Sequence, residues 1–237
     1  MKKIVVLFLV SVSTLLISQA TKADTLADWT FESSGLGSYL PGANTVTTNF
    51  YAEGGLQAGT AAATGLHAGN ATYSSPSGDD STKSLSSTLW AVGDFYQFQL
   101  NTLNYSNVML SFEQVSSATG PSSFNLQYSL NGSSFTTFSS YTVTNAPSWS
   151  PTTGPFSSSS FSADLSSITA LDNASSVYFR LVDANNTVDA AGTAGVGTGG
   201  TDRVDDFIVS ALPVPEPSAL VLSTLGGIAL LALRRRR

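Results

Sequence analysis

The stretch Ser123-Phe124-Asn125-Leu126-Gln127-Tyr128-Ser129-Leu130-Asn131-Gly132 decides the fold class. Polar and apolar residues alternate in it with a period of two, which is typical of a β-strand with one buried face. Asn131-Gly132 is the preferred pair for a tight hairpin turn, because both residues tolerate a positive φ. Phe135 to Val143 then returns as the partner strand. We therefore predict a β-hairpin here and an all-β chain.

Further strand-like segments lie on both sides of this hairpin, separated by clusters of Gly, Ser, Pro and Asn. They are Leu26 to Glu32, Thr45 to Tyr51, Phe95 to Leu100, Val108 to Phe112, Phe156 to Ala163, Val177 to Val182 and Arg203 to Ser210. This number of short strands predicts a two-sheet antiparallel sandwich of jelly-roll type. Two Ala- and Gly-rich segments, Gly54 to Gly69 and Asp189 to Thr201, are predicted to be long surface loops.

The composition excludes several classes of function. Only 11% of the 237 residues are charged, and there is no cysteine, so disulfides and thiolate metal sites are excluded. Between Asp24 and Pro213, three basic and fifteen acidic residues give a net charge of −12. Nucleic-acid binding needs a basic face, so it is not expected. Cations and neutral polymers remain possible ligands, and solubility alone would also explain the charge.

The first 23 residues have the pattern of a secretory signal peptide. Two lysines precede an apolar run from Ile4 to Ile17, and small residues follow it. Cleavage by signal peptidase is expected after Ala20 or Ala23. The alternative is a retained N-terminal anchor helix, for which this apolar run is short.

Few residues point to catalysis, and we predict that the protein is not an enzyme and has no catalytic residue. His67 is the single histidine and lies in an Ala- and Gly-rich segment, so we expect it on a surface loop. No Gly-x-Ser-x-Gly element frames a serine. Paired carboxylates for glycoside hydrolysis could come from Glu32, Glu53, Glu113 or the aspartates, but sequence does not place two of them across a cleft.

Two acidic segments suggest a site for a hard cation. Glu32 ends the first predicted strand, and Asp205 and Asp206 lie in the last one. Strict alternation would put Val204, Asp206 and Ile208 on one face and Asp205, Phe207 and Val209 on the other, so one aspartate would point towards the apolar face. A buried carboxylate needs a partner or a metal ion. The alternative partners are Arg180 and Arg203, or a turn that the aspartate caps.

This pair of strands resembles the first and last strands of carbohydrate-binding-type jelly rolls. In those proteins a strand-end glutamate and a late aspartate share a structural calcium ion. The resemblance implies Glu32, Asp205 and Asp206 as calcium ligands here, and carboxylate oxygens suit calcium. Among the tryptophans, Trp29 and Trp90 are expected in the core. Trp149 lies between two prolines and is the expected exposed platform for a sugar ring.

The C-terminal segment has three parts in a fixed order. Val214, Pro215, Glu216 and Pro217 form a proline-rich step that disfavours helix. Residues 218–233 are almost all apolar or small and would span about 24 Å as a helix, less than a hydrocarbon core of about 30 Å. Arg234, Arg235, Arg236 and Arg237 would stop transfer and remain on the cytoplasmic side.

These three parts together resemble the PEP-CTERM sorting signal. The resemblance implies an envelope with an inner membrane, and a polytopic membrane enzyme, an exosortase, that recognises the tail and cleaves it near the motif. Delivery to the cell surface or to the exopolysaccharide matrix of a biofilm would follow. The alternative is a plain single-pass anchor.

We therefore expect a signal peptide at 1–23, a β-sandwich domain at 24–212 and a sorting signal at 213–237 with a transmembrane helix. The predicted function is that of an exported surface or matrix protein with a structural or polysaccharide-binding role. Two alternatives stay open: a secreted carbohydrate-active hydrolase, and a bitopic membrane protein that keeps its tail.

Overall fold

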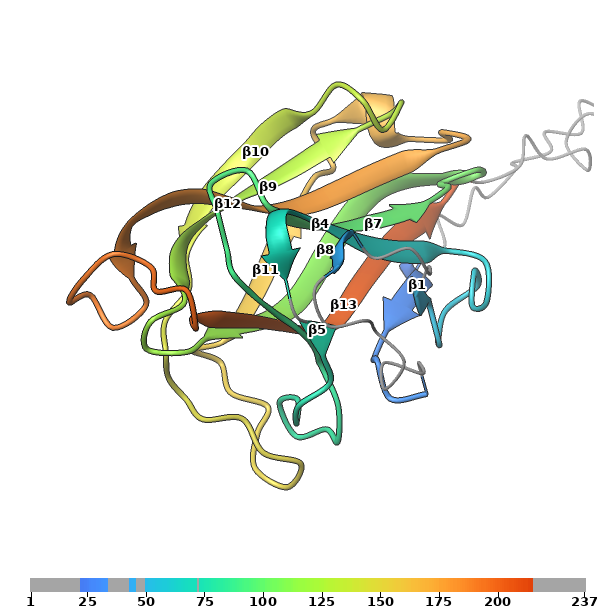
Figure 1. Cartoon of the computed structure of the whole chain (residues 1–237). Coiled ribbons are helices and arrows are strands. Elements are labelled where there is room, and N and C mark those ends of the chain that lie inside the picture. The colour runs from blue at the N-terminus through green and yellow to red at the C-terminus, as the bar shows by residue number, and fades with distance from the viewer. Residues whose placement is uncertain (1–21, 34–42, 46–49, 72, 215–237) are drawn as a thin grey trace, which may run out of the picture.

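The computed structural model describes residues 22–33, 43–45, 50–71 and 73–214. Two antiparallel β-sheets lie face to face in it (Figure 1). The only helical element among the described residues is one short 3₁₀ turn, η2 (Thr169–Leu171). The prediction of an all-β chain with two antiparallel sheets is therefore confirmed.

The six-stranded sheet is called sheet A. Its spatial order is β11 (Ser160–Asp164), β8 (Tyr105–Ser116), β13 (Thr201–Pro213), β6 (Leu85–Thr88) and β5 (Tyr73–Ser74), and β1 (Asp24–Trp29) also pairs with β13. One edge of β13 pairs with β8, while its other edge pairs with β6 and then with β1. The last described strand thus occupies the centre of sheet A.

The seven-stranded sheet is called sheet B. Its order is β10 (Thr136–Thr142), β9 (Pro121–Ser129), β12 (Val177–Asp189), β7 (Phe95–Leu100), β4 (Ala62–Ala71) and β2 (Ala43–Thr45), and β3 (Phe50–Tyr51) pairs with β4. The chain crosses repeatedly between the two sheets, and the first described strand pairs with the last.

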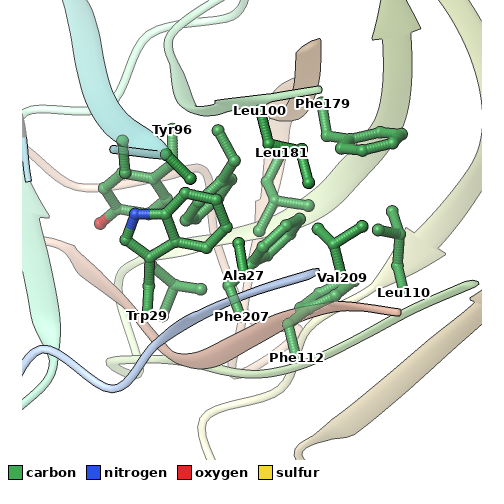
Figure 2. Packing of buried hydrophobic residues seen from close by; sticks show 14 of the residues in the cluster. Ala27, Trp29, Tyr96, Leu100, Leu110, Phe112, Phe179, Leu181, Phe207 and Val209 are labelled. Carbon is green, nitrogen blue, oxygen red and sulfur yellow. The ribbon is translucent and has the colours of Figure 1, made fainter. Parts of the chain in front are cut away.

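Aromatic side chains fill the space between the sheets (Figure 2). Phe98 of β7 stacks on Phe207 of β13 with ring centroids 3.6 Å apart, and Trp29 packs edge-on against Phe98 with ring centroids 5.2 Å apart. Phe112 of β8 stacks on the Phe207 ring at 5.6 Å. Complete burial of such a side chain contributes about 2 kcal/mol or more to folding, so this cluster fixes the two sheets against each other.

The predicted hairpin is present as β9 and β10, but its turn is longer than expected. The strands pair from Ser123 with Thr142 to Tyr128 with Thr136. Gly132 has a φ of 69°, whereas Asn131 keeps a negative φ and its side-chain oxygen accepts hydrogen bonds from the Ser133 and Ser134 amides. Asn131 therefore stabilises the loop through its side chain and not through a positive φ.

One of the two loop predictions needs correction. The segment Gly54 to Gly69 was expected to be a surface loop, yet its second half forms β4, which pairs with β7 and β3. Ala63 and Gly65 face the core, where small side chains leave room for the Tyr73 ring. Asp189 to Thr201 was also expected to be a loop, and it is one apart from the strand residues at its two ends. Small residues therefore mark close packing in the second half of the first segment and a loop in the second segment.

The predicted signal peptide, apart from residues 22 and 23, and the predicted C-terminal helix lie outside the described residues. Within the described part of the chain, no helix has the length and apolar character needed to cross a membrane.

Candidate metal centre

Three carboxylates gather on the outer face of sheet A. Oxygen atoms of Glu113 in β8 and of Asp205 and Asp206 in β13 all lie within 4.8 Å of one another. Glu113 and Asp205 are direct cross-strand partners. Because the neighbouring Phe112 packs between the sheets, Glu113 and its partner point away from sheet B.

A β-bulge explains how two successive aspartates reach the same site. The register between β13 and β8 shifts between Asp205 and Ile208, and Asp206 has a left-handed φ of 42°. Such a bulge inserts one extra residue and redirects the side chains after it. Val204 and Phe207 consequently both face the core. The expected strict alternation is therefore wrong, and neither aspartate has to point towards the apolar face.

The loop that precedes β6 lies directly on Asp205, one of the three carboxylates. Asp205 Oδ2 accepts hydrogen bonds from the Asp79 amide at 3.2 Å and from Ser81 Oγ at 2.6 Å. A Cβ atom added at Gly78 would overlap Asp205 Oδ2 and would lie 2.5 Å from the Lys83 carbonyl oxygen. Only glycine fits at this point, so the loop is shaped to lie directly on the acidic group.

Several buried carboxylate oxygens near the site have no hydrogen-bond donor. Glu113 is 8% exposed and its Oε2 is unpartnered. Asp79 is 2% exposed; its Oδ2 accepts bonds from the Phe156 amide and Ser159 Oγ, while its Oδ1 has no partner. Oδ1 of Asp28 is also unpartnered. Unpaired buried acceptors are costly, and a bound cation removes that cost.

Burial and mutual repulsion make these acids hard to ionise together. Burial, followed by the charge of Asp79, raises the pKa of Glu113 to about 8. Burial also raises the pKa of Asp205 to about 8, despite the hydrogen bond from Ser81. The pKa of Asp206 rises to about 6 through burial and the nearby Asp28. Ionisation of these three acids is therefore costly unless a bound cation compensates their negative charge.

The residues present fit a calcium ion. Calcium binds six to eight oxygen atoms, mostly from carboxylates, carbonyl groups and water. Glu113, Asp205 and Asp206 offer carboxylate oxygens from two strands. Within the described residues, Arg203 donates to the Ser77 carbonyl and Arg180 stacks between two aromatic rings, and neither forms an ion pair with these acids. The predicted alternative of an arginine partner is thus not what the structure contains.

Glu32 lies beside this site but has a different role. Its carboxylate accepts hydrogen bonds from the Lys83 amide at 2.7 Å and from Thr82 Oγ1, and its carbonyl oxygen accepts from Lys83 Nζ at 2.6 Å. Glu32 therefore holds the end of the covering loop. The structure brings Asp205 and Asp206 together as predicted, with Glu113 in the place expected for Glu32.

Glu113 could have been found from its position in the sequence. It is an acid directly after Phe112 in an otherwise apolar and polar-neutral strand, and such a residue needs a specific partner. From the sequence alone, Glu113 is a candidate only for a carboxylate pair in glycoside hydrolysis. The pairing of β8 with β13, which places it beside Asp205, is not visible in the sequence.

Trp149 and His67 are not where the sequence predicted them. Trp149 was expected to be exposed, but it is 6% exposed and its Nε1 donates to Ser159 Oγ at 3.2 Å. Its indole lies inside the loop, so it offers no platform for a sugar. His67 is fully buried in β4, with Nδ1 3.1 Å from Asp94 Oδ2 and its ring 4.5 Å from the Trp90 ring. Trp29 and Trp90 are in the core, as predicted.

The outer face of sheet B has a contrasting composition. Its outward positions in the central strands include several amides and one cation, together with Ser123, Tyr178 and Val182. The amides and the cation are Gln97 and Gln99 in β7, Asn125 and Gln127 in β9, and Arg180 in β12. The Arg180 guanidinium lies 3.7 Å from the Phe95 ring centroid and 3.6 Å from that of Phe135, and its Nε donates to Gln97. No carboxylate occupies an outward position of β7, β9 or residues 177–182 of β12.

A depression of about 350 Å³ lies at one end of this face. Its lining is largely polar and comprises Tyr51, Gln57, Thr60, Ala61, Ala62, Gln99, Leu100, Asn101, Ser175 and Ser176. This end of the molecule also contains the last residues of β13.

The C-terminal end of β13 leads directly into the tail. Pro213 is the last strand residue and pairs with Tyr105, and the Val214 amide donates to the Asn104 carbonyl oxygen at 2.8 Å. Residues 213–237 match the family model of the PEP-CTERM protein-sorting motif. The chain carries a PEP-CTERM sorting motif. This motif marks the protein for export and for sorting at the cell surface, and it implies processing by an exosortase. It describes the tail and not the sandwich.

The sandwich itself is similar to several solved structures at low identity. One is the Clostridium thermocellum endo-1,4-beta-D-xylanase 10B with its CBM22-1 and GH10 modules, complexed with xylohexaose. The TM-score is 0.43 at 11% sequence identity, and the match covers 83% of this chain and 30% of that one. A second is the CBM22-1-CBM22-2 tandem domain of Paenibacillus barcinonensis Xyn10C: TM-score 0.43, 15% identity, 83% of this chain and 51% of that one. A third is the K3 cleaved adhesin domain of Lys-gingipain from Porphyromonas gingivalis W83: TM-score 0.35, 12% identity, 78% of this chain and 99% of that one.

The chain thus spans less than a third of the first of these proteins and about half of the second. No curated protein matches its sequence. At this level of similarity, the ligands of these proteins are not assigned to this chain.

Proposed function

We propose that this chain is a non-enzymatic surface or exopolysaccharide-matrix protein whose sandwich is stabilised by calcium. One observation carries the proposal: the sorting motif begins at Pro213, the residue in which the folded domain ends. In this proposal residues 218–233 hold the precursor in the inner membrane, and Arg234 to Arg237 stop its transfer. An exosortase then removes the tail near Val214 to Pro217. The three prolines at 213, 215 and 217 support this, because they keep the backbone extended for a protease cleft.

Calcium would act on the outer face of sheet A. Glu113, Asp205 and Asp206 would hold it, and the ion would supply the positive charge that these buried acids lack. Asp79 and Ser81 orient Asp205 from the covering loop through their hydrogen bonds. The loop, β8 and β13 would then be fixed to one another through a single site.

A polysaccharide-binding role is favoured by the outer face of sheet B. Side-chain amides donate and accept hydrogen bonds as sugar hydroxyls do, and the absence of outward carboxylates there avoids repulsion of acidic sugars.

Affinity electrophoresis in gels that contain neutral or acidic polysaccharide tests this role. Q97A and Q127A should lose retardation by the polymer that retards the unaltered chain, whereas S111A on sheet A should keep it. Equal mobility of all four chains in every gel would exclude this face.

The hydrolase alternative has weaker support. Glu113 and Asp205 are close enough for a pair of carboxylates, but both are buried under the loop that contains Gly78 and Asp79. A sugar ring would have no access to them. Turnover on a panel of polysaccharides would contradict the proposal.

The sorting role is tested by deleting residues 214–237 and fractionating cells that express the shortened chain. We expect the full chain in the membrane or surface fraction and the shortened chain in the periplasm or the medium. A matched control replaces the four C-terminal arginines by glutamines and keeps the rest of the tail. A shortened chain that stays with the membrane would refute sorting by the tail.

The calcium role is tested by thermal melting of the protein with calcium chloride and with a chelator. We expect a higher Tm with calcium, and we expect E113Q to lose most of this difference. D164N removes an exposed acid on β11 and should respond to calcium like the unaltered protein. Identical melting curves with and without calcium would exclude the site.

A further inference from the structure

Both ends of the sandwich domain leave it at the same place. β1 begins at Asp24, which is the cross-strand partner of Ala211 near the end of β13. Tyr105, the partner of Pro213, donates its hydroxyl to Asp24 Oδ2 at 3.0 Å. Figure 1 shows β1 and β13 side by side in sheet A. The predicted signal peptide and the sorting motif therefore extend from one end of the sandwich, here called the exit end.

The exit end carries large apolar side chains in water. Leu56 is 63% exposed, Leu103 is 47% exposed and Val214 is 44% exposed. Hydrogen bonds connect the three: the Val214 amide donates to Asn104, which follows Leu103 in the chain, and the Leu103 amide donates to Asn101 Oδ1. The Asn101 amide in turn donates to Gln57 Oε1, next to Leu56. These three residues therefore lie on one hydrogen-bonded platform.

This platform is held rigidly. The Asn104 amide donates to Asn173 Oδ1 at 2.9 Å, and the Asn173 amide donates to the Tyr105 carbonyl at 2.8 Å. Thr102 is fully buried, and its hydroxyl donates to the Leu171 carbonyl. The end of β13 consequently has a fixed position relative to Leu103.

The tail is too short to hold this end far from a membrane. Three residues separate Val214 from Ser218, the first residue of the apolar segment. Four Cα-to-Cα steps of extended chain span at most about 14 Å. The headgroup region on each side of a bilayer is itself about 5–8 Å thick. The exit end of a membrane-held precursor therefore has to lie at or close to the headgroups.

The apolar segment also draws the domain inward. Its sixteen residues would span about 24 Å if they were helical, which is shorter than a hydrocarbon core of about 30 Å. A short segment pulls its flanking residues into the interfacial region. Exposed leucines held at that depth gain free energy by entering the boundary between headgroups and acyl chains.

We propose that the exit end of the sandwich, through Leu56, Leu103 and Val214, is a lipid-contacting surface in the uncleaved precursor. This rests on the proposed function, because it requires the apolar tail to hold the precursor in the bilayer. Its occupant is the outer surface of the inner membrane, contacted by side chains that are exposed to water once the tail is removed. The domain would then leave the membrane when its tail is cut, since three side chains give only weak, reversible attachment.

The absence of cysteine makes this surface easy to probe. Single variants L56C and L103C of the full chain, tail included, carry an NBD fluorophore and are reconstituted into phosphatidylcholine–phosphatidylglycerol vesicles. V92C is the matched control, because Val92 is 61% exposed and lies before β7, whereas Leu103 follows it. The six residues of β7 separate these positions by about 20 Å.

Vesicles containing lipid with a nitroxide near the headgroup should quench most of the emission at positions 56 and 103, and little of it at position 92. Two probe positions guard against one label disturbing its own surroundings. Equal quenching at 92 and 103, in chains that float with the vesicles, would overturn the lipid-contacting surface and leave the anchored tail intact. Chains that do not float would overturn both the surface and the membrane-held precursor.

Discussion

At the scale of single residues, Gly78 allows the loop before β6 to lie directly on Asp205 of the candidate metal centre. It is the point where the covering loop touches Asp205, and a methyl group has no space there. We expect G78A to destabilise the fold by about 1–3 kcal/mol, the typical cost of overpacking a well-filled site. We also expect it to abolish most of the rise in Tm that calcium produces. Urea unfolding with and without calcium measures both effects.

Gly199 provides the control for this substitution. A Cβ atom added there would meet nothing within 4 Å. G199A should therefore stay within about 0.5 kcal/mol of the unaltered protein, as surface substitutions usually do. If G78A and G199A had the same stability and the same response to calcium, the close fit of the loop over Asp205 would be wrong.

Asp183 is a buried acid with a predictable effect of pH. Burial raises its pKa from 3.8 to about 6, although the Asn185 amide hydrogen bond lowers it. A carboxyl group with a raised pKa in the folded state contributes stability below its unfolded pKa, and this contribution is lost as the pH rises through about 6. The shift corresponds to at most about 3 kcal/mol. Asn cannot ionise and avoids this loss.

We therefore expect D183N to be more stable than the unaltered protein at pH 7, with the advantage shrinking as the pH falls to 4. Urea unfolding at pH 4, 5, 6 and 7 measures the difference, in which the titration of all other groups cancels. D164N is the control, since Asp164 is exposed and hydrogen bonds to Ser166 lower its pKa. A difference between D183N and the unaltered protein that did not change with pH would contradict the assignment.

At the scale of elements, the bulge in β13 determines where the acids point. Asp206 has a φ of 42°, which Asn and Asp tolerate and β-branched residues do not. We expect D206V to lose about 1–2 kcal/mol of unfolding free energy and all of its calcium response. D206N should keep the stability of the metal-free protein and lose part of the calcium response. Chemical unfolding with a chelator separates the two variants, and equal stabilities would mean that the bulge does not need a left-handed residue.

Strands with regular alternation could be predicted from the sequence, and irregular ones could not. Phe95 to Leu100 was predicted with the bounds that β7 has, because apolar and polar residues alternate along most of it. β4 was missed because Ala and Gly carry no periodic signal, although small residues are what the packing against Tyr73 requires. The bulge was missed because alternation is assumed until a register is known.

The candidate site shows the same division. Two acids on one strand, Asp205 and Asp206, could be singled out from the sequence. Glu113 could not be placed beside them, because that needs the pairing of two strands about 90 residues apart in sequence. Trp149 was misjudged because its flanking prolines indicated a loop, and the loop folds back so that Ser159 accepts the indole hydrogen bond.

At the scale of the whole molecule, the intact mass of the mature protein depends on whether the C-terminal tail is removed. We expect its intact mass to lack the four C-terminal arginines, with the loss beginning near residues 213–218. Mass spectrometry of protein recovered from the cell surface or the medium measures this. Protein purified from a strain without the processing enzyme is the control and should retain the tail. A mature protein that includes Arg237 would favour the bitopic alternative.

The order of strands along the chain also sets the timing of folding during export. β13 is the centre of sheet A, yet among the described strands it is the last along the chain and so the last of them to cross the membrane during export. Before β13 is available, one edge of β8 is unpaired, and β1 and β6 lack the strand with which both of them pair. The long-range pairing of sheet A therefore cannot form until β13 has been exported. A chain that ends before Thr201 should remain sensitive to protease, whereas one that ends at Val214 should resist it; resistance of both would mean that sheet A closes without β13.

In the proposed export route, folding of sheet A would become possible only when export ends. The apolar segment of residues 218–233, which would halt the chain in the proposed export route, follows β13 by only a few residues in the sequence. If the proposed membrane segment stops the chain, we expect the domain to travel unfolded and to acquire β13 only as its movement through the membrane stops.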